Sequence, residues 1–394
     1  MELTDERRYL RDAVRGLLAQ HQRGDAGDDR SLWRRLCGEI GVAGLAIPQR
    51  YGGAGAGPVE TNIVMEELGR GLTRSPLLGS AVLAAQALLA SGDTVACRRL
   101  LPAIADGSAV AALAWTTPAG HWDPGEAACA ARPAARTSAA DAIQAIAEAA
   151  GPEAGPGAPQ GTVPSVSSPD DWVVTGEAHH VLDGDQAGVL LAAARTAGGV
   201  GLFEVDPRDR GVTRAAVTSM DTTRRLAIVR LDRAPGRPTG TGPASTALAR
   251  ARDLACIALS AEQVGAAQRA LELTVAYTKV RVQFGRAIGS FQALQHRMAG
   301  LHVLVESARS LSYAAADAAA GDAADLGLHA AAAKVYCSEA LARVAGEMIQ
   351  MHGAIGITWE HDAHRYLKRA HGAGQLFGRP SEHAARVAAA VIDG

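Results

Sequence analysis

The sequence predicts an α+β multidomain protein, with an N-terminal helical domain, a middle antiparallel β domain and a C-terminal bundle of the four-helix type. Three observations predict this plan. The chain of 394 residues is too long for one small core. Apolar residues recur at helical spacing near both ends, and the middle holds short strand-like runs without amphipathic helices between them. The expected domains are residues 1–110, 111–243 and 244–394.

The N-terminal domain opens with a helix whose start is marked in the sequence. Thr4 is expected to cap this helix, because acidic residues follow it in the first turn. Apolar side chains then repeat about one turn apart, at Leu10, Val14 and Leu17. Pro and Gly break the helical pattern at residues 47–53, which predicts a loop, and residues 64–71 resume the pattern.

The middle domain is expected to be a sheet or a barrel. Four runs rich in strand-forming residues are separated by turn residues, at 172–175, 189–192, 201–205 and 226–231. Because no amphipathic helices intervene, an antiparallel arrangement is favoured over a doubly wound one. Residues 123–170 are rich in Ala, Pro, Gly and Ser, so we expect a mobile, exposed insertion there, with room for one short helix at 138–149.

Long helices return in the C-terminal domain. One is expected over residues 248–279. Apolar residues then follow at 3-4-3-4 spacing from 291 to 305 and at 4-3-4-4 spacing from 333 to 348. Together these three helices predict a helical bundle.

Composition excludes several classes of function. Lys and Arg number 39 against 41 Asp and Glu, so no basic surface for nucleic acid or anionic lipid is expected. The start shows no signal pattern and no run of about 18 apolar residues occurs, which predicts a cytoplasmic protein outside membranes. The five cysteines lie far apart, and His361 and His364 lack the H-E-x-x-H pattern, so neither disulfides nor a metal site is predicted.

One segment between two predicted helices combines groups that suit a diphosphate with a stacked ring nearby. Arg281, Gln283, Phe284 and Gln292 lie within twelve residues that also contain flexible glycines. The alternative is an ordinary helix-helix turn in which Ser290 caps the second helix.

A second Gly-rich break, from Gln350 to Gly356, closes the third long helix. Gly353 is suited to end that helix in a left-handed conformation, or to let a ligand approach the backbone closely. The glycines at residues 52–55 do not complete a G-x-G-x-x-G pattern and follow a helical region, so a Rossmann domain is not predicted.

Taken together, these segments resemble the acyl-CoA dehydrogenase family. The family's Y-G-G loop, its R-x-x-F-G-x-x-I-x-x-F-Q turn and its Q-x-x-G-x-x-G helix end all occur, over nearly the whole chain. The resemblance implies a tetramer in which each FAD lies between one subunit's β domain and a neighbour's C-terminal helices. It also implies that the neighbour's FAD is held by Arg281, Gln283, Phe284, Gln292, Gln350 and Gly353.

The same resemblance implies the reaction. A proton leaves the carbon next to a thioester, and a hydride leaves the following carbon for the flavin. This requires a carboxylate base and hydrogen bonds to the enolate-like oxygen. The two positions where family members carry the base are occupied by Phe377 and Ala255, and neither side chain accepts a proton. The chain is therefore expected to supply no catalytic residue.

The family's contacts to the flavin ring are also altered. Thr116 is kept in the segment that matches T-E-P-x-x-G-S-D, whereas Trp122 takes the place of its Ser. Leu182 replaces a Thr that reaches flavin N5 in the family, and it has no hydroxyl to offer. Residues that would serve a neighbour's flavin are thus retained, while those that would serve a flavin on the chain's own β domain are changed.

This asymmetry is similar to that of actinobacterial family members that form heterotetramers, in which one subunit supplies the base. The prediction is an FAD-dependent acyl-CoA dehydrogenase in which this chain is the base-lacking subunit. Its partners would be an acyl-CoA substrate and a homologous subunit that supplies the catalytic Glu. Two alternatives stay open: a self-sufficient homotetramer with a relocated base, and a non-enzymatic structural partner that binds no flavin.

Overall fold

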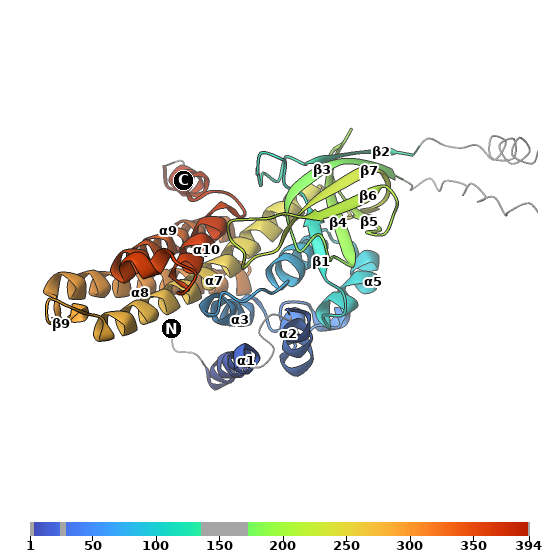
Figure 1. The fold of residues 1–394 in the computed structure, drawn as a ribbon. Coiled ribbons are helices and arrows are strands. Elements are labelled where there is room, and N and C mark those ends of the chain that lie inside the picture. The colour runs from blue at the N-terminus through green and yellow to red at the C-terminus, as the bar shows by residue number, and fades with distance from the viewer. Residues whose placement is uncertain (1–3, 24–28, 135–171, 393–394) are drawn as a thin grey trace, which may run out of the picture.

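A computed structural model describes residues 4–23, 29–134 and 172–392 (Figure 1). Most of the expected insertion at 123–170, including the short helix expected at 138–149, lies outside the described residues.

Helices form the N-terminal part of the molecule: α1 (Asp5–Arg23), α2 (Asp29–Arg35), α3 (Pro58–Arg70), α4 (Ala85–Ala90) and α5 (Thr94–Ala105). The Thr4 hydroxyl accepts a hydrogen bond from the Arg7 amide at 3.3 Å, which confirms the predicted cap of α1. The break expected between helices contains only a short 3₁₀ turn, Gln49–Tyr51, before α3 begins.

The β domain is a closed sheet of seven strands: β1 (Ala111–Ala114), β2 (Cys129–Pro133), β3 (Trp172–Leu182), β4 (Val189–Thr196), β5 (Gly199–Val205), β6 (Val212–Ala216) and β7 (Leu226–Thr239). The strands follow one another as β4-β2-β3-β7-β5, and β5 also pairs with β4, which closes the barrel. Most pairs are antiparallel, as predicted, but β1 and β2 each pair with β4 in parallel.

Strand β2 lies inside the segment that the sequence assigned to an insertion. It pairs with β3 from Cys129 opposite Gly176 to Pro133 opposite Trp172. Residues 129–133 therefore belong to the barrel, and that part of the expectation is corrected. Small residues dominate β2, so the β-branched pattern that marks other strands is absent there.

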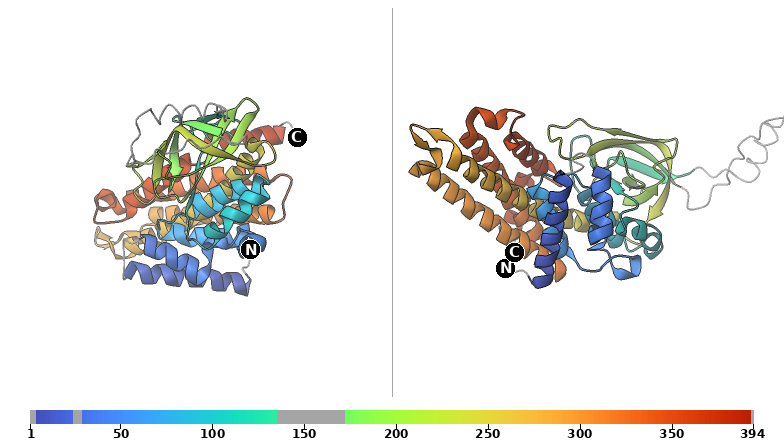
Figure 2. Two further views of the ribbon diagram at one scale, coloured as in Figure 1. Left: turned by 90° about the vertical axis from the view of Figure 1, so that its right-hand side faces the viewer. Right: turned by 60° about the horizontal axis from the view of Figure 1, so that its bottom comes forward.

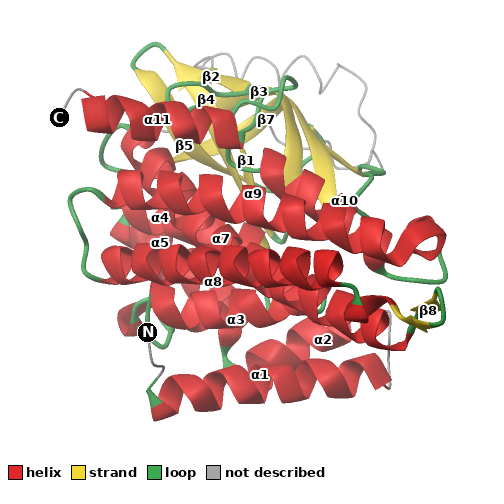
Figure 3. Ribbon diagram, turned by 90° about the vertical axis from the view of Figure 1, so that its left-hand side faces the viewer, coloured by secondary structure: helices red, strands yellow, loops and turns green. Residues whose placement is uncertain are grey.

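The C-terminal helices are α7 (Ala244–Val280), α8 (Gln292–Ala320), α9 (Leu326–His352), α10 (Ala363–Gln375) and α11 (Pro380–Ile392). Helices α7, α8 and α9 lie side by side as the predicted bundle (Figure 3). A hairpin of β8 (Val282–Gln283) and β9 (Arg286–Ala287) connects α7 to α8. The hairpin and the barrel lie at opposite ends of the molecule (Figures 1 and 2).

Helix α3 crosses α7 at a distance that requires glycine on both helices. A Cβ atom at Gly265 would lie 1.8 Å from the carbonyl oxygen of Glu66, and one at Gly69 would lie 2.0 Å from that of Glu262. This contact joins the N-terminal helices to the bundle. The largest apolar cluster likewise extends from α1 through β1 and α7 to Phe377, so the three expected domains share one core.

A buried ion network joins the barrel to the bundle. Arg369 of α10 has a side chain that is 2% exposed, and it donates to Glu262 of α7 at 2.8 Å. The same guanidinium donates to the Thr223 hydroxyl at 2.8 Å and to the Thr223 carbonyl at 2.7 Å. Glu262 is thus committed to a structural ion pair. Among the described helices, none holds an apolar stretch long enough to cross a bilayer.

Candidate functional site

Four of the predicted cofactor residues lie at the hairpin end of the bundle. Arg281 follows the last residue of α7, Gln283 and Phe284 belong to the hairpin, and Gln292 begins α8. All four are exposed, and Phe284 exposes 92% of its surface. Phe284 also has a positive φ of 49°, so the turn holds its ring outward at some conformational cost.

Gln350 and Gly353 lie at the C-terminal end of α9, at the same end of the bundle. Tyr277 of α7 stacks on His352 with 4.3 Å between ring centroids, and its hydroxyl donates to the His352 carbonyl at 3.3 Å. This contact fixes the end of α9 beside the end of α7. Gly353 has a positive φ of 65°, and both Gln350 and Gly353 are exposed. The structure therefore brings six predicted residues to one exposed end of the bundle.

The bundle end also holds a polar atom that sequence reasoning missed. His352 Nδ1 donates to the Met348 carbonyl at 2.7 Å, so Nε2 is left as an acceptor. Nε2 is buried and has no partner among the described residues. Burial lowers the pKa of His352, which keeps the ring neutral. A buried acceptor without a partner beside Gly353 suits a site completed by another molecule.

Thr116, the seventh predicted residue, lies in the barrel and not at the bundle end. It follows β1, and its carbonyl accepts a hydrogen bond from the His179 amide at 3.0 Å. Its hydroxyl is buried without a partner in the described part of the chain. The predicted cofactor residues thus form two groups, six at the bundle end and Thr116 shortly after β1 of the barrel.

The two groups fit the halves of an FAD unequally. The bundle end offers a guanidinium, amides and an exposed aromatic ring, which suit a diphosphate and its adenosine. In the barrel, the unpartnered Thr116 hydroxyl suits a ring heteroatom. Leu182, however, packs on the helical turn Leu78–Ala84, since a Cβ atom at Gly79 would lie 2.7 Å from the Leu182 Cβ. Of the three flavin-ring positions Thr116, Trp122 and Leu182, only Thr116 keeps the polar residue that the family has there.

Packed aromatic rings fill the position that the resemblance assigns to the family base. Phe377 lies between α10 and α11, is fully buried, and has a positive φ of 61°. Its ring centroid lies 5.0 Å from that of Trp122, which lies 5.6 Å from that of Trp115. Ala255, at the second base position, is also fully buried in α7. Sequence reasoning noted the replacement residues but did not predict that two of them, Trp122 and Phe377, pack together.

A relocated base would have to be a carboxylate, and Asp253, Glu382 and Glu360 are each held by another group or exposed. Asp253 of α7 pairs with Arg386 of α11 at 3.1 Å. Glu382 accepts a hydrogen bond from the Arg379 amide at 3.2 Å. Glu360 is exposed at the other end of α10. None of these side chains is presented to the Phe377 ring as an unpaired base.

His383 and Cys256 lie next to Phe377 but are also unsuited to accept a proton. His383 Nε2 donates to the Phe377 carbonyl at 2.9 Å, and Nδ1 faces Arg386 at 3.2 Å. Burial lowers the pKa of His383 to about 4. The Cys256 sulfur lies 3.8 Å from His383 Nε2, and burial raises the pKa of its thiol to about 12. Both groups are therefore neutral and committed to packing at neutral pH.

The histidines considered for a metal site have other roles. His361 Nδ1 accepts a hydrogen bond from the Ala363 amide at 3.1 Å, and His364 packs edge-on against Trp359 at 4.5 Å. Within the described ranges, no group of three or more His, Cys, Asp or Glu is arranged to hold a metal ion.

The order of a helical domain, a closed β domain and a helical bundle agrees with the fold of the flavin-dependent acyl-CoA dehydrogenases. Family models agree. Residues 4–108 match the acyl-CoA dehydrogenase N-terminal domain, and residues 240–392 match the acyl-CoA dehydrogenase C-terminal domain. The chain belongs to the acyl-CoA dehydrogenase family, whose members are FAD-dependent oxidoreductases.

Known proteins are similar over the full length. Acyl-CoA dehydrogenase IpdE2 of Mycobacterium tuberculosis is 38% identical over 96% of this chain and 95% of its own. IpdE2 of Mycolicibacterium smegmatis is 37% identical over 99% of this chain and 100% of its own. Among solved structures, the Tcur3481-Tcur3483 steroid ACAD variant has a TM-score of 0.81 at 28% identity, covering 99% of this chain and 98% of that one. The ChsE4-ChsE5 complex from M. tuberculosis has a TM-score of 0.80 at 26% identity, covering 100% and 99%.

Proposed function

We propose that this chain is the base-lacking subunit of a heteromeric acyl-CoA dehydrogenase that removes the α and β hydrogens of an acyl-CoA thioester. The observation that carries the proposal is the fully buried Phe377 ring, packed on Trp122 where the family base belongs. Asp253 is paired and Glu382 is hydrogen bonded, so neither serves as a ready replacement. Two similar structures are each named for a pair of chains, Tcur3481-Tcur3483 and the ChsE4-ChsE5 complex, and both support a heteromeric assembly.

The proposed role of the chain is to complete a flavin site on a homologous partner. Arg281 would hold the flavin diphosphate, with Gln283, Phe284 and Gln292 beside it and with Gln350 and Gly353 from the end of α9. All six residues are exposed at the bundle end, as a contribution to a neighbouring subunit requires. The flavin, when bound, supplies the hydride acceptor. The partner subunit would supply the Glu that takes the proton, in an assembly we propose to be a tetramer.

The test is co-expression of this chain with a homologous dehydrogenase subunit that carries a Glu at the base position. We expect a yellow complex with acyl-CoA dehydrogenase activity, which the partner's Glu→Gln variant abolishes. In the same complex, Arg281→Ala should weaken flavin binding by roughly 30-fold, since a charge-assisted diphosphate contact contributes about 2 kcal/mol. Arg98→Ala, an exposed arginine on α5, is the matched control and should leave flavin content unchanged.

The same preparations decide between the alternatives. A yellow, active preparation of this chain alone would show a self-sufficient homotetramer with a relocated base. A complex that forms without flavin absorbance would show a non-enzymatic structural partner. Full flavin content in the Arg281→Ala complex would remove that residue from the proposed site.

A further inference from the structure

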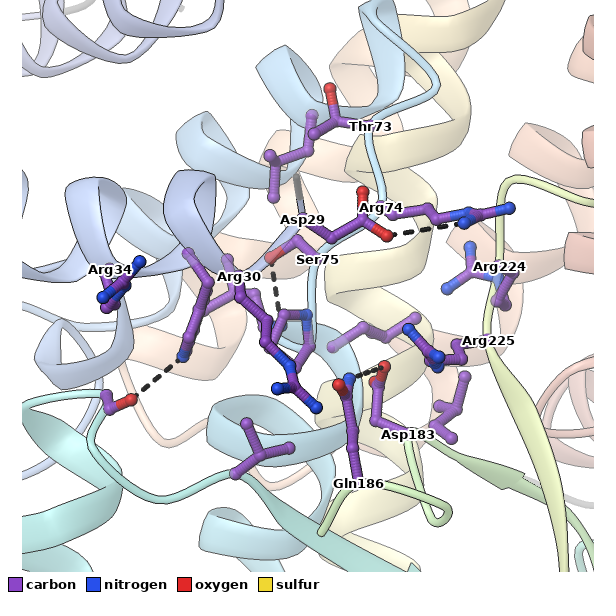
Figure 4. Close-up of a pocket in the computed structure, with 18 of the residues that line it drawn as sticks. Asp29, Arg30, Arg34, Thr73, Arg74, Ser75, Asp183, Gln186, Arg224 and Arg225 are labelled. Carbon is purple, nitrogen blue, oxygen red and sulfur yellow. Dashed lines mark hydrogen bonds and ion pairs between the residues drawn. The ribbon is translucent and has the colours of Figure 1, made fainter. Parts of the chain in front are cut away.

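A cavity of about 660 Å³ lies where the N-terminal helices meet the barrel. Its walls include α2, the loop at residues 73–78, residues 107–110, the turn between β3 and β4, and residues 223–225 before β7, with further side chains from α3, α7 and α10. Figure 4 shows Arg30 and Arg34 on one side and Arg224 and Arg225 on the other. The cavity is of the size that small-molecule sites have, roughly 300–1,000 Å³.

Cationic side chains outnumber acidic ones in this cavity. Three carboxylates line it, Asp29, Asp183 and Glu262. Seven guanidinium groups line it, those of Arg30, Arg34, Arg74, Arg208, Arg224, Arg225 and Arg369.

Several of these arginines already have a partner. Arg74 pairs with Asp29 at 3.4 Å, and Arg225 pairs with Asp185 at 3.0 Å. The guanidinium groups of Arg34 and Arg208 make no ion pair or hydrogen bond to any described residue. The cavity therefore retains positive charge that the described part of the protein does not neutralise.

The buried side chain of Arg224 carries a hydrogen-bond donor that a ligand could satisfy. Its side chain is 8% exposed and is ion-paired with Glu262. Its Nε has no hydrogen-bond partner among the described residues, although buried N–H groups normally have one. A guanidinium with a free N–H matches the planar geometry of a carboxylate.

The floor of the cavity is apolar. Trp33, Met65, Leu68, Leu77 and Leu182 line it and are buried. An apolar floor below an arginine-lined wall suits a molecule with an apolar body and an anionic head. A purely inorganic anion would leave that floor without a partner.

We propose that this cavity binds an apolar carboxylate, with Arg224 facing the carboxylate, the unpaired Arg34 and Arg208 adding to the positive charge of the cavity, and the apolar floor facing the body. The carboxylate belongs either to a free organic acid or to the far end of an acyl-CoA thioester, and both share this chemistry. The proposal does not depend on the assembly proposed above, because binding to the full chain is measured without turnover.

The test is titration calorimetry of the full-length chain with 1-naphthylacetate, compared with its neutral isostere 1-naphthylacetamide. We expect saturable binding of the carboxylate and at least about tenfold weaker binding of the amide, the loss typical of one charge-assisted contact. Arg34→Gln combined with Arg208→Gln should weaken binding of the carboxylate by about tenfold or more and leave binding of the amide unchanged. These two side chains are exposed, so the fold should persist. Arg98→Gln, which removes one positive charge at an exposed position outside the cavity, is the control.

Equal affinity for the two probes, absence of saturable binding, or an undiminished affinity in the double variant would each overturn the site. Competition then identifies the source of the carboxylate. Displacement of 1-naphthylacetate by suberyl-CoA but not octanoyl-CoA assigns the anion to the end of a thioester. Displacement by free suberate alone assigns a separate acid. Failure of both suberate and suberyl-CoA to displace the probe counts against the proposal.

Discussion

Asp183 offers a quantitative test of the structure at the edge of this cavity. Its side chain is buried, with 6% of the residue exposed, and it accepts a hydrogen bond from the Gln186 amide at 3.2 Å. Burial raises the pKa of this carboxyl from 3.8 to about 7, although nearby Arg224 and the Gln186 hydrogen bond oppose the shift. The folded protein therefore holds this proton over a pH range in which the unfolded chain has released it.

Whether stability rises or falls with pH depends on which state, folded or unfolded, binds more protons at Asp183. Between pH 3.8 and about 7 the folded state binds more protons at Asp183 than the unfolded state, so the free energy of unfolding falls as pH rises. Relative to the protonated carboxyl, the loss is about 2 kcal/mol at pH 5 and about 4 kcal/mol at pH 8. Asp183→Asn removes this dependence. The variant should therefore gain about 2–3 kcal/mol over the wild type between pH 5 and pH 8.

The assay is urea unfolding of both proteins at the two pH values, followed by circular dichroism. His383, whose pKa burial lowers to about 4, adds the opposite dependence below pH 6.5, but it is common to both proteins and cancels in their difference. Asp317→Asn, an exposed position on α8, is the control and should differ from the wild type by the same small amount at both pH values. A gain by Asp183→Asn below about 1 kcal/mol would refute the reasoning from burial.

Three further predictions follow from buried contacts. Lys334 is fully buried and donates to two carbonyls at the end of α10 at 2.9 and 3.0 Å. Lys334→Met should therefore lower the free energy of unfolding by about 1–3 kcal/mol in urea. Lys279→Met, at an exposed position, is the control. Gly265→Ala should prevent folding or soluble expression, because its Cβ would lie 1.8 Å from a carbonyl oxygen of α3. In an active complex with a partner, Asp253→Asn should keep turnover within about tenfold of wild type, or roughly 1.4 kcal/mol, whereas a larger loss would identify it as the base.

Much of the fold could be predicted because long helices carry their own signal. The periodic apolar residues of α7, α8 and α9 lie within one element each, so the sequence window that shows them is the element itself. Strands β1 and β2 gave no such signal, since small residues such as Ala111–Ala114 pack well in a barrel but lack β-branched side chains. Their parallel pairing with β4 depends on contacts far apart in the sequence, which no local pattern reports.

The candidate site was predictable only as separate motifs. The sequence singled out Arg281 and Gly353 but could not place them at one end of the bundle, since that depends on the stacking of Tyr277 on His352. The arginine-lined cavity was missed for a similar reason. Its walls come from segments spread along the chain from α2 to α10, so no local stretch of sequence reports their combined charge.

The packing of Trp122 on Phe377 gives a physical reason why two of the altered motif positions carry large aromatic side chains. A catalytic chamber that has lost its base and its ring contacts would be a void, and a void in a protein core costs van der Waals contacts on every wall. Two large rings at a centroid distance of 5.0 Å remove that void, and Phe377 is fully buried in the result. The exposed residues at the bundle end belong to no core, so packing within the chain gives no reason to keep them. Under the proposed function these residues contact a ligand shared with another subunit, and the Arg281→Ala complex tests that explanation directly.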